Sequence, residues 1–273
     1  MGLPARIGAP GRAPARSGRG GPPGPVVGSA RTMFGLFSKE KTRKRLIEKA
    51  TNKHGQQPDR WGALEKLFED GSEEALLGMC KRFAVTSGKS SEDEAEKSWV
   101  VDRLAEKGAV VLPPLQAYMA EALELALALT VLGRVAQPPQ VLEVVDAVLA
   151  REKPGYTRHP ERRIDLFRWL GEYQGATDAQ VVDRVAPYVD DFDENVRFVV
   201  ADVLGAHDPA LAGPHLIRGL TRPEEESGRV KRRIAEILAE KKVPLGDTSA
   251  AVAAALTGTV ASFRVRGDVL VGG

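Results

Sequence analysis

Cysteine is almost absent from the sequence, because Cys80 is the only one among 273 residues. A single cysteine excludes a framework of intramolecular disulfides and a metal site built from several thiolates. Cys80 lies in the apolar stretch ALLGMCKRFAV, which predicts a helix, and we interpret it as a small core side chain. Aromatic residues make up only 5% of the chain, so leucine, valine and alanine must fill the core, which favours packed helices.

Long apolar runs and the usual catalytic motifs are also missing. The stretch LELALALTVLG at 123–133 is too short to span a bilayer and is flanked by acids. The four histidines, His54, His159, His207 and His215, have no spacing that places two ligands on one helix face. We find no phosphate-binding glycine loop, HExxH motif, nucleophile elbow or catalytic acid pair. We therefore expect a cytoplasmic protein with no membrane span, no metal and no cofactor.

The positive charge is concentrated at the N-terminus. The chain carries a net charge of +2, but residues 1–32 contain five arginines and no acid, which leaves −3 for the rest. A weakly acidic body does not favour binding to nucleic acid. Residues 1–32 are rich in glycine and proline and have no apolar periodicity, so we expect a disordered tail. We interpret this tail as an extension upstream of a start at Met33, with a basic arm that contacts nucleic acid as the alternative.

The rest of the chain falls into three parts. Residues 33–57 predict a basic helical lead-in, 58–245 a helical-repeat domain, and 246–273 a C-terminal cap. Within the repeat domain, the polar stretch KSSEDEAEK at 89–97 predicts a connection between helices. In the cap we expect a short helix capped by Asp247, and then a hairpin that turns at Gly267-Asp268.

A Leu-Gly or Leu-Ala pair recurs along the repeat domain. The steps between the pairs are 28, 38, 34 and 34 residues, which is the period of a helical hairpin repeat. Apolar residues three and one positions before each leucine predict that one side of every such helix is buried by its neighbours. The pairs begin at Leu104, Leu132, Leu170, Leu204 and Leu238.

The clearest copy, DENVRFVVADVLGAHDP at 193–209, resembles the second helix of HEAT-like repeats of the bilin-lyase-related kind. The shared features are an acid, Val-Arg, small residues, Leu-Gly and then Asp-Pro. The resemblance is weaker at 160–174 and 228–240 and poor before residue 120. Together with the period, it predicts an all-α fold, an α-solenoid of about five antiparallel helical hairpins closed by a small irregular or β-hairpin cap.

Four basic residues stand seven positions before a repeat leucine and are the best candidates for a site. If the second helices line the concave side, as the resemblance implies, these residues form a stripe that grips an acidic peptide or a phosphate. The alternative, which we favour, is a ladder between repeats, because Asp191 and Glu225 each precede a member of the set by six residues. The set is Lys97, Arg163, Arg197 and Lys231.

Trp169, beside Arg168 and near Tyr173, is a candidate aromatic contact, although packing is the preferred interpretation. HEAT-like repeats serve as scaffolds more often than as enzymes. We therefore expect a monomeric, non-catalytic protein-binding scaffold or adaptor with an unknown protein partner. The alternative is a HEAT-like nucleic-acid-binding enzyme such as an alkylated-base DNA glycosylase.

Overall fold

The computed structural model describes residues 30–272. The predicted tail therefore lies outside the described residues, except for its last three. These three belong to helix α1 (Ala30–Ala50), which begins before Met33 because neither proline nor glycine interrupts the chain there. The chain divides into two units, Met1–Lys41 and Thr42–Gly273, and the following description concerns the second unit.

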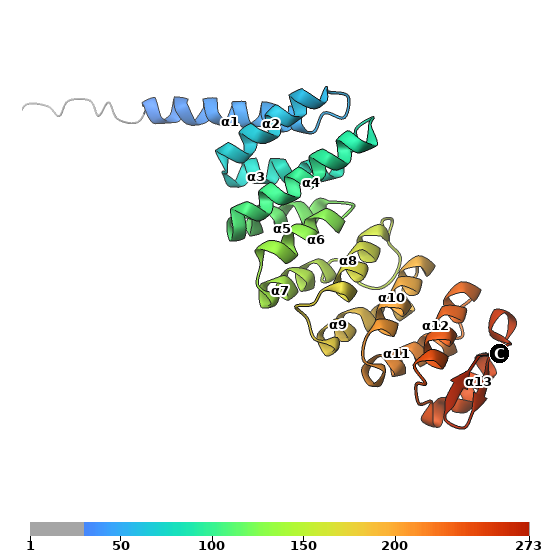
Figure 1. The fold of residues 1–273 in the computed structure, drawn as a ribbon. Helices are drawn as coiled ribbons and strands as arrows, with labels where there is room; N and C mark the ends of the chain where they lie inside the picture. The colour runs from blue at the N-terminus through green and yellow to red at the C-terminus, as the bar shows by residue number, and fades with distance from the viewer. Residues whose placement is uncertain (1–29, 273) are drawn as a thin grey trace, which may run out of the picture. The chain divides into compact units, whose positions relative to one another are not determined.

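Helices in two rows build the second unit (Figure 1). In one row each helix packs on the next: α2 (Gln57–Asp70), α4 (Ser90–Lys107), α6 (Ala126–Val135), α8 (Glu161–Glu172), α10 (Glu194–Ala206) and α12 (Gly228–Glu240). The other row contains α3 (Glu73–Cys80), α5 (Leu112–Glu121), α7 (Pro138–Leu149), α9 (Asp178–Val185), α11 (Pro209–Thr221) and α13 (Ser249–Ala255). The predicted all-α solenoid is confirmed, and the five recurring leucines all lie on helices of the first row.

Short 3-10 turns extend or join several of these helices. They are η1 (Lys81–Ala84), η2 (Gly108–Val111), η3 (Ala186–Asp190), η4 (Gly246–Thr248) and η5 (Gly258–Val260). The turn η1 continues α3 without a break and leads through residues 85–89 to the start of α4.

The polar stretch 89–97 is not a connection, as its composition had indicated. Helix α4 begins at Ser90 and includes almost all of the stretch. The error has a physical reason: Asp93 and Glu96 are buried on the face that also carries Val100 and Leu104, and buried arginines neutralise them. Polarity therefore concealed a helix with a charged buried face.

The C-terminal cap contains the expected hairpin, with β1 (Arg264–Arg266) antiparallel to β2 (Val269–Val271). Leu270 of β2 is buried, and β2 packs on α12. Asp268 in the turn accepts the backbone N–H groups of Leu245 and Gly246, which holds the hairpin to the chain after α12. The expectation for Asp247 is wrong, because Asp247 lies in η4 and the N-cap residue of α13 is Thr248, whose side chain does not cap the helix.

The recurring Leu-Gly pair has a packing explanation. On three glycines an added Cβ would lie within about 3 Å of a side chain of the next helix in the row. Each of those side chains stands one position before the next repeat leucine, so the glycine is the surface on which the next helix packs. The contacts are Gly133 with Trp169, Gly171 with Val203, and Gly205 with Ile237.

Substituting Gly171→Ala should therefore destabilise the protein. The new Cβ would lie 2.9 and 3.0 Å from the two methyl carbons of Val203, whose branched side chain has little freedom to move. We expect overpacking to cost about 1–3 kcal/mol, more than the roughly 1 kcal/mol that alanine gains over glycine in a helix.

The measurement is urea unfolding followed by circular dichroism, with Gly62→Ala in α2 as the matched control. An added Cβ at Gly62 meets nothing within 4 Å, so that variant should be as stable as the parent or more stable. Equal stabilisation by the two substitutions would contradict the packing role of Gly171.

Candidate functional site

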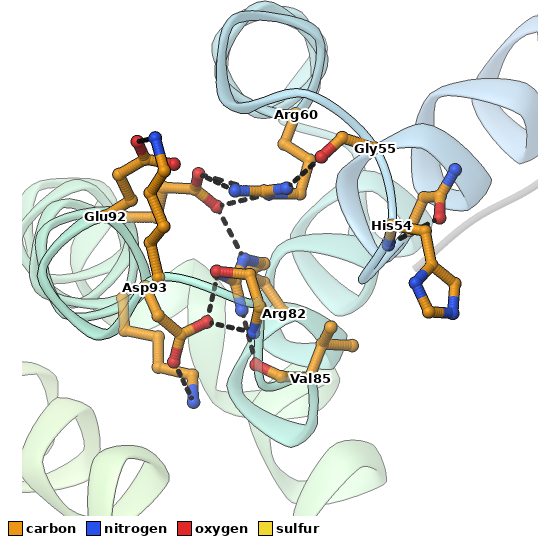
Figure 2. Close-up of polar contacts among 12 residues, drawn as sticks. His54, Gly55, Arg60, Arg82, Val85, Glu92 and Asp93 are labelled. Carbon is orange, nitrogen blue, oxygen red and sulfur yellow. Dashed lines mark hydrogen bonds and ion pairs between the residues drawn. The ribbon is translucent and has the colours of Figure 1, made fainter.

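Four charged side chains form a buried cluster near the start of the repeats (Figure 2). Arg60 from α2 and Arg82 from η1 share the carboxylate of Glu96, at 2.8 Å for Arg60 Nη2 to Oε1 and 2.8 Å for Arg82 Nε to Oε2. Arg82 also donates from Nη2 to Oδ1 of Asp93 at 2.6 Å. Glu96 and Arg82 are completely buried, so each charge depends on its partner for stabilisation.

The same arginines hold two loops in place. Arg60 Nη1 donates to the carbonyl oxygen of Gly55 at 2.5 Å, and Arg82 Nη1 donates to that of Val85 at 2.6 Å. The backbone N–H of Ser87 donates to Asp93 at 2.9 Å. The cluster thus fixes the loop before α2 and the loop before α4 relative to each other.

Asp93 stays ionised in this setting. Burial raises the pKa of Asp93, but hydrogen bonds from Lys97 and Arg82 outweigh this effect and hold its pKa well below the usual range. Lys97 Nζ lies 2.8 Å from the second oxygen of the carboxylate. The hydrogen bond from Arg60 to Glu96 likewise raises the pKa of the Arg60 guanidinium. The cluster therefore keeps its full set of charges.

A pocket of about 500 Å³, here called the α2/α4 pocket, lies between the two loops. Its lining includes the N-cap residues of both helices, Gln56 before α2 and Lys89 before α4, and neither helix has a side-chain cap. The first N–H groups of a helix have no acceptor within that helix, and they carry the positive end of its dipole. The full lining is Lys53, His54, Gly55, Gln56, Gln57, Pro58, Arg60, Ser87, Gly88, Lys89 and Glu92.

Side chains add to the positive character of the α2/α4 pocket. Lys53 and Lys89 are exposed in its lining, and Glu92 pairs with Lys89 at 2.9 Å. Ser87 also lines the pocket; it is 7% exposed, and its hydroxyl has no hydrogen-bond partner. With the buried cluster and Lys97 included, this region contains more cations than carboxylates. The five cations are Lys53, Arg60, Arg82, Lys89 and Lys97, and the three carboxylates are Glu92, Asp93 and Glu96.

The four basic residues that the sequence singled out do not meet in one site. Arg163 Nη1 lies 2.6 Å from Asp191, and Arg197 binds Glu225 through Nε and Nη2 at 2.6 and 2.8 Å. Each of these pairs joins residues 28 positions apart, on adjacent repeats. Lys97 pairs with Asp93 as described, and Lys231 is half-buried with no ion pair to any described residue.

The pairing differs in one respect from the ladder inferred from sequence. Asp191 gives its carboxylate to the arginine of the preceding repeat, while its backbone carbonyl accepts from Arg197 at 2.9 Å. Arg163 also donates to the carbonyl of Gly155 at 2.7 Å. Both arginines are buried, and every nitrogen of their guanidinium groups except Nε of Arg163 donates within the protein.

Trp169 packs inside the helix rows, half-buried. Its ring stacks on that of Tyr173, with centroids 4.8 Å apart, and an added Cβ on Gly133 would lie 3.0 Å from it. Cys80 is fully buried, and burial raises its thiol pKa to about 12, so it remains protonated at neutral pH. Trp169 and Cys80 do not line the α2/α4 pocket.

Residues 30–272, the part that the structure describes, lack two features that would indicate a function. In that part of the chain, no group of three or more His, Cys, Asp or Glu side chains is placed to hold a metal ion. None of the helices there is both long and apolar enough to cross a membrane.

The sequence interpretation missed most of the cluster and its pocket. Asp93, Glu96 and Lys97 share one helix face with Val100 and Leu104, a spacing of three and four that could have indicated burial. Arg60 and Arg82 carry no such signal, because their partners lie 36 and 14 residues away.

Asp93→Asn tests the cluster through its pH dependence. Removing one buried carboxylate leaves Arg82 and Lys97 without that partner, and we expect a loss of about 2–4 kcal/mol in unfolding free energy at about pH 7. Because the folded-state pKa of Asp93 is depressed, its contribution is present above the unfolded pKa of about 4 and is lost as the pH falls through the folded value.

Urea unfolding of both proteins at about pH 7 and about pH 3 gives the comparison, and the difference between them should shrink at the lower pH. Asp183→Asn on α9 is the matched control, because Asp183 is exposed and makes no ion pair with a described residue. A constant difference at the two pH values would contradict the ionised state assigned to Asp93.

Comparison with known proteins gives few relatives. No family model matches the chain, and no curated protein matches it. A solved structure of human deoxyhypusine hydroxylase in complex with glycerol is similar at 17% identity, with a TM-score of 0.30, over 82% of this chain and 91% of that one. A likeness at this level carries no argument about the chemistry of this chain.

The expectation of a non-catalytic scaffold or adaptor is corrected on one point. The matched protein is by its name a hydroxylase, so catalysis is no longer excluded, although the match shows no activity of this chain. The alternative of an alkylated-base DNA glycosylase has no support from any match.

Proposed function

We propose that this protein binds a ligand bearing a phosphate group in the α2/α4 pocket. One observation carries the proposal: the uncapped N-termini of two helices, α2 with 14 residues and α4 with 18, open into the same pocket. Helix N-termini bind anions because their free N–H groups and the helix dipole both favour negative charge. At α2 the dipole is the main contribution, because Pro58 has no N–H and the N–H of Asp59 donates to the carbonyl of Gln56.

The side chains of the pocket support an anion of this kind. Lys53 and Lys89 supply charge at the rim, and the hydroxyl of Ser87 is a donor with no partner inside the protein. The pairing of Lys89 with Glu92 at 2.9 Å is exposed and weak, so an incoming anion can replace Glu92 as the partner of Lys89. The buried cluster keeps the loops ordered before the ligand arrives, which reduces the entropy lost on binding.

Broader expectations about the chain stay proposals beside this one. We infer that the repeats are HEAT-like and of the bilin-lyase-related kind, on the strength of the motif at 193–209 and the repeat period. We also propose a cytoplasmic location, which the single cysteine supports, and no nucleic-acid ligand, which the weakly acidic body supports. A monomeric state and a protein partner are proposed with them.

Titration calorimetry of the full chain with inorganic phosphate and with glycerol phosphate tests the pocket. Saturable binding is expected, and Lys53→Met or Lys89→Met should each weaken it about tenfold, because one hydrogen bond to a charged group contributes about 1.5 kcal/mol. Glu92→Gln should strengthen binding, since it removes a competing negative charge. Tighter binding of glycerol phosphate than of inorganic phosphate would indicate that the natural ligand is an ester.

Two further variants separate binding from folding. Ser87→Ala removes a hydroxyl that has no partner in the free protein, so affinity should fall while the melting temperature stays unchanged. Lys66→Met replaces an exposed lysine of α2 outside the pocket and should bind like the parent. The proposal fails if phosphate does not bind, or if Lys53→Met and Lys66→Met bind it equally.

A further inference from the structure

A second hollow of about 430 Å³ lies on the other helix row, between α3 and α5. Leu77 and Ala84 line it from α3 and η1, and Ala117 lines it from α5. Leu123, just after α5, completes the lining and is 54% exposed, which is unusual for a large apolar side chain. This hollow is a place where an apolar side chain of another molecule can be buried.

The apolar surface continues beyond this hollow. A smaller hollow of about 240 Å³ shares Glu124 with the first and is lined by Phe83 and Leu127. The two hollows together, here called the α3/α5 groove, extend from α3 past α5 to α6 and to the start of α8. An extended groove of this kind fits a peptide segment better than a compact small molecule.

The charge along the α3/α5 groove is mostly negative. Glu121, Glu124 and Glu161 are exposed in its lining, and none of them is ion-paired with a described residue. Asp165 also lines it and accepts the N–H groups at the start of α6. Against these four carboxylates, the lining of the two hollows contains one cation, Lys81. The groove therefore combines an apolar surface with unneutralised negative charge.

The Tyr118 side chain gives a further indication that this surface is incomplete. Its ring lines the larger hollow, yet only 6% of the residue is exposed, and the hydroxyl has no hydrogen-bond partner. Burial raises the pKa of Tyr118, so the hydroxyl keeps its proton and remains a donor. The hydroxyl itself is covered by protein atoms, so a backbone carbonyl of a bound segment would accept from it only after a small movement of the ring.

We propose that the α3/α5 groove binds a basic amphipathic segment of a partner protein. Apolar side chains of that segment fill the two hollows, while its lysines or arginines face Glu121, Glu124 and Glu161. A second copy of this chain that used the same groove would bring these carboxylates against their own counterparts, which like-charge repulsion disfavours. The charge of the groove therefore selects a cationic partner, in contrast to the α2/α4 pocket.

A defined peptide tests the proposal on the full chain. The probe is a dye-labelled helical peptide with leucines on one face and lysines on the other, and fluorescence anisotropy measures its binding. We expect at least tenfold tighter binding than for the same peptide with glutamates in place of lysines, or for a scrambled one. Raising the salt concentration should weaken the interaction.

Variants locate the peptide on the protein. Glu121→Lys with Glu124→Lys should abolish the preference for the lysine peptide, and Leu123→Ser should weaken binding without unfolding an already exposed site. Glu226→Lys with Glu240→Lys is the matched control, because both side chains are exposed, lie outside the groove and make no ion pair with a described residue. Circular dichroism establishes that each variant is folded.

Several results would overturn the proposal. These are equal affinity for the lysine, glutamate and scrambled peptides, or unchanged binding to the Glu121 and Glu124 variant. Analytical ultracentrifugation of the protein without peptide measures whether the chain associates with itself. Self-association that Leu123→Ser abolishes would place a second copy in the groove instead. Phosphate has no role in these assays, so failure of the α2/α4 pocket to bind it leaves this inference standing.

Discussion

Close packing between successive helices of one row is the constraint on which the rest of the structure depends. At Gly133, Gly171 and Gly205 the backbone of one helix is in direct contact with a side chain of the next. Such a helix cannot bury its apolar face alone, so its stability comes from its neighbours in the row. The distance between repeats that these glycines permit also brings polar groups on adjacent repeats within hydrogen-bonding range.

Buried charge is the second consequence of that spacing. In the later repeats Arg163 binds the carboxylate of Asp191 and Arg197 binds that of Glu225, in each case 28 residues further along the chain. Both arginines also donate to loop carbonyls. In the first repeats Arg60 and Arg82 share Glu96 and bind the carbonyls of Gly55 and Val85. A guanidinium has five donors, so one side chain can neutralise a carboxylate and fix a loop together. The α2/α4 pocket exists because two loops are fixed in this way.

The turn η1 contributes to both of the proposed binding surfaces. Its Arg82 belongs to the buried cluster beneath the α2/α4 pocket, while Lys81 and Ala84 line the α3/α5 groove. The pocket presents helix N-termini and lysines, and the groove presents glutamates around apolar side chains. On the two proposals made above, ligands of opposite charge bind at different places on the same unit.

The sequence by itself determined the architecture, because the repeat of Leu-Gly pairs reports a packing requirement that recurs with a fixed period. It also indicated the hairpin at the C-terminus through alternation around Gly267-Asp268. Only the tertiary structure decided which charges are buried and which loops meet. Arg60 and Glu96 are 36 residues apart, and 89–97 looked like an exposed linker by composition. Apolar periodicity is a local property that one helix displays, whereas an ion pair that does not recur from repeat to repeat, such as that of Arg60 with Glu96, leaves no pattern in either segment.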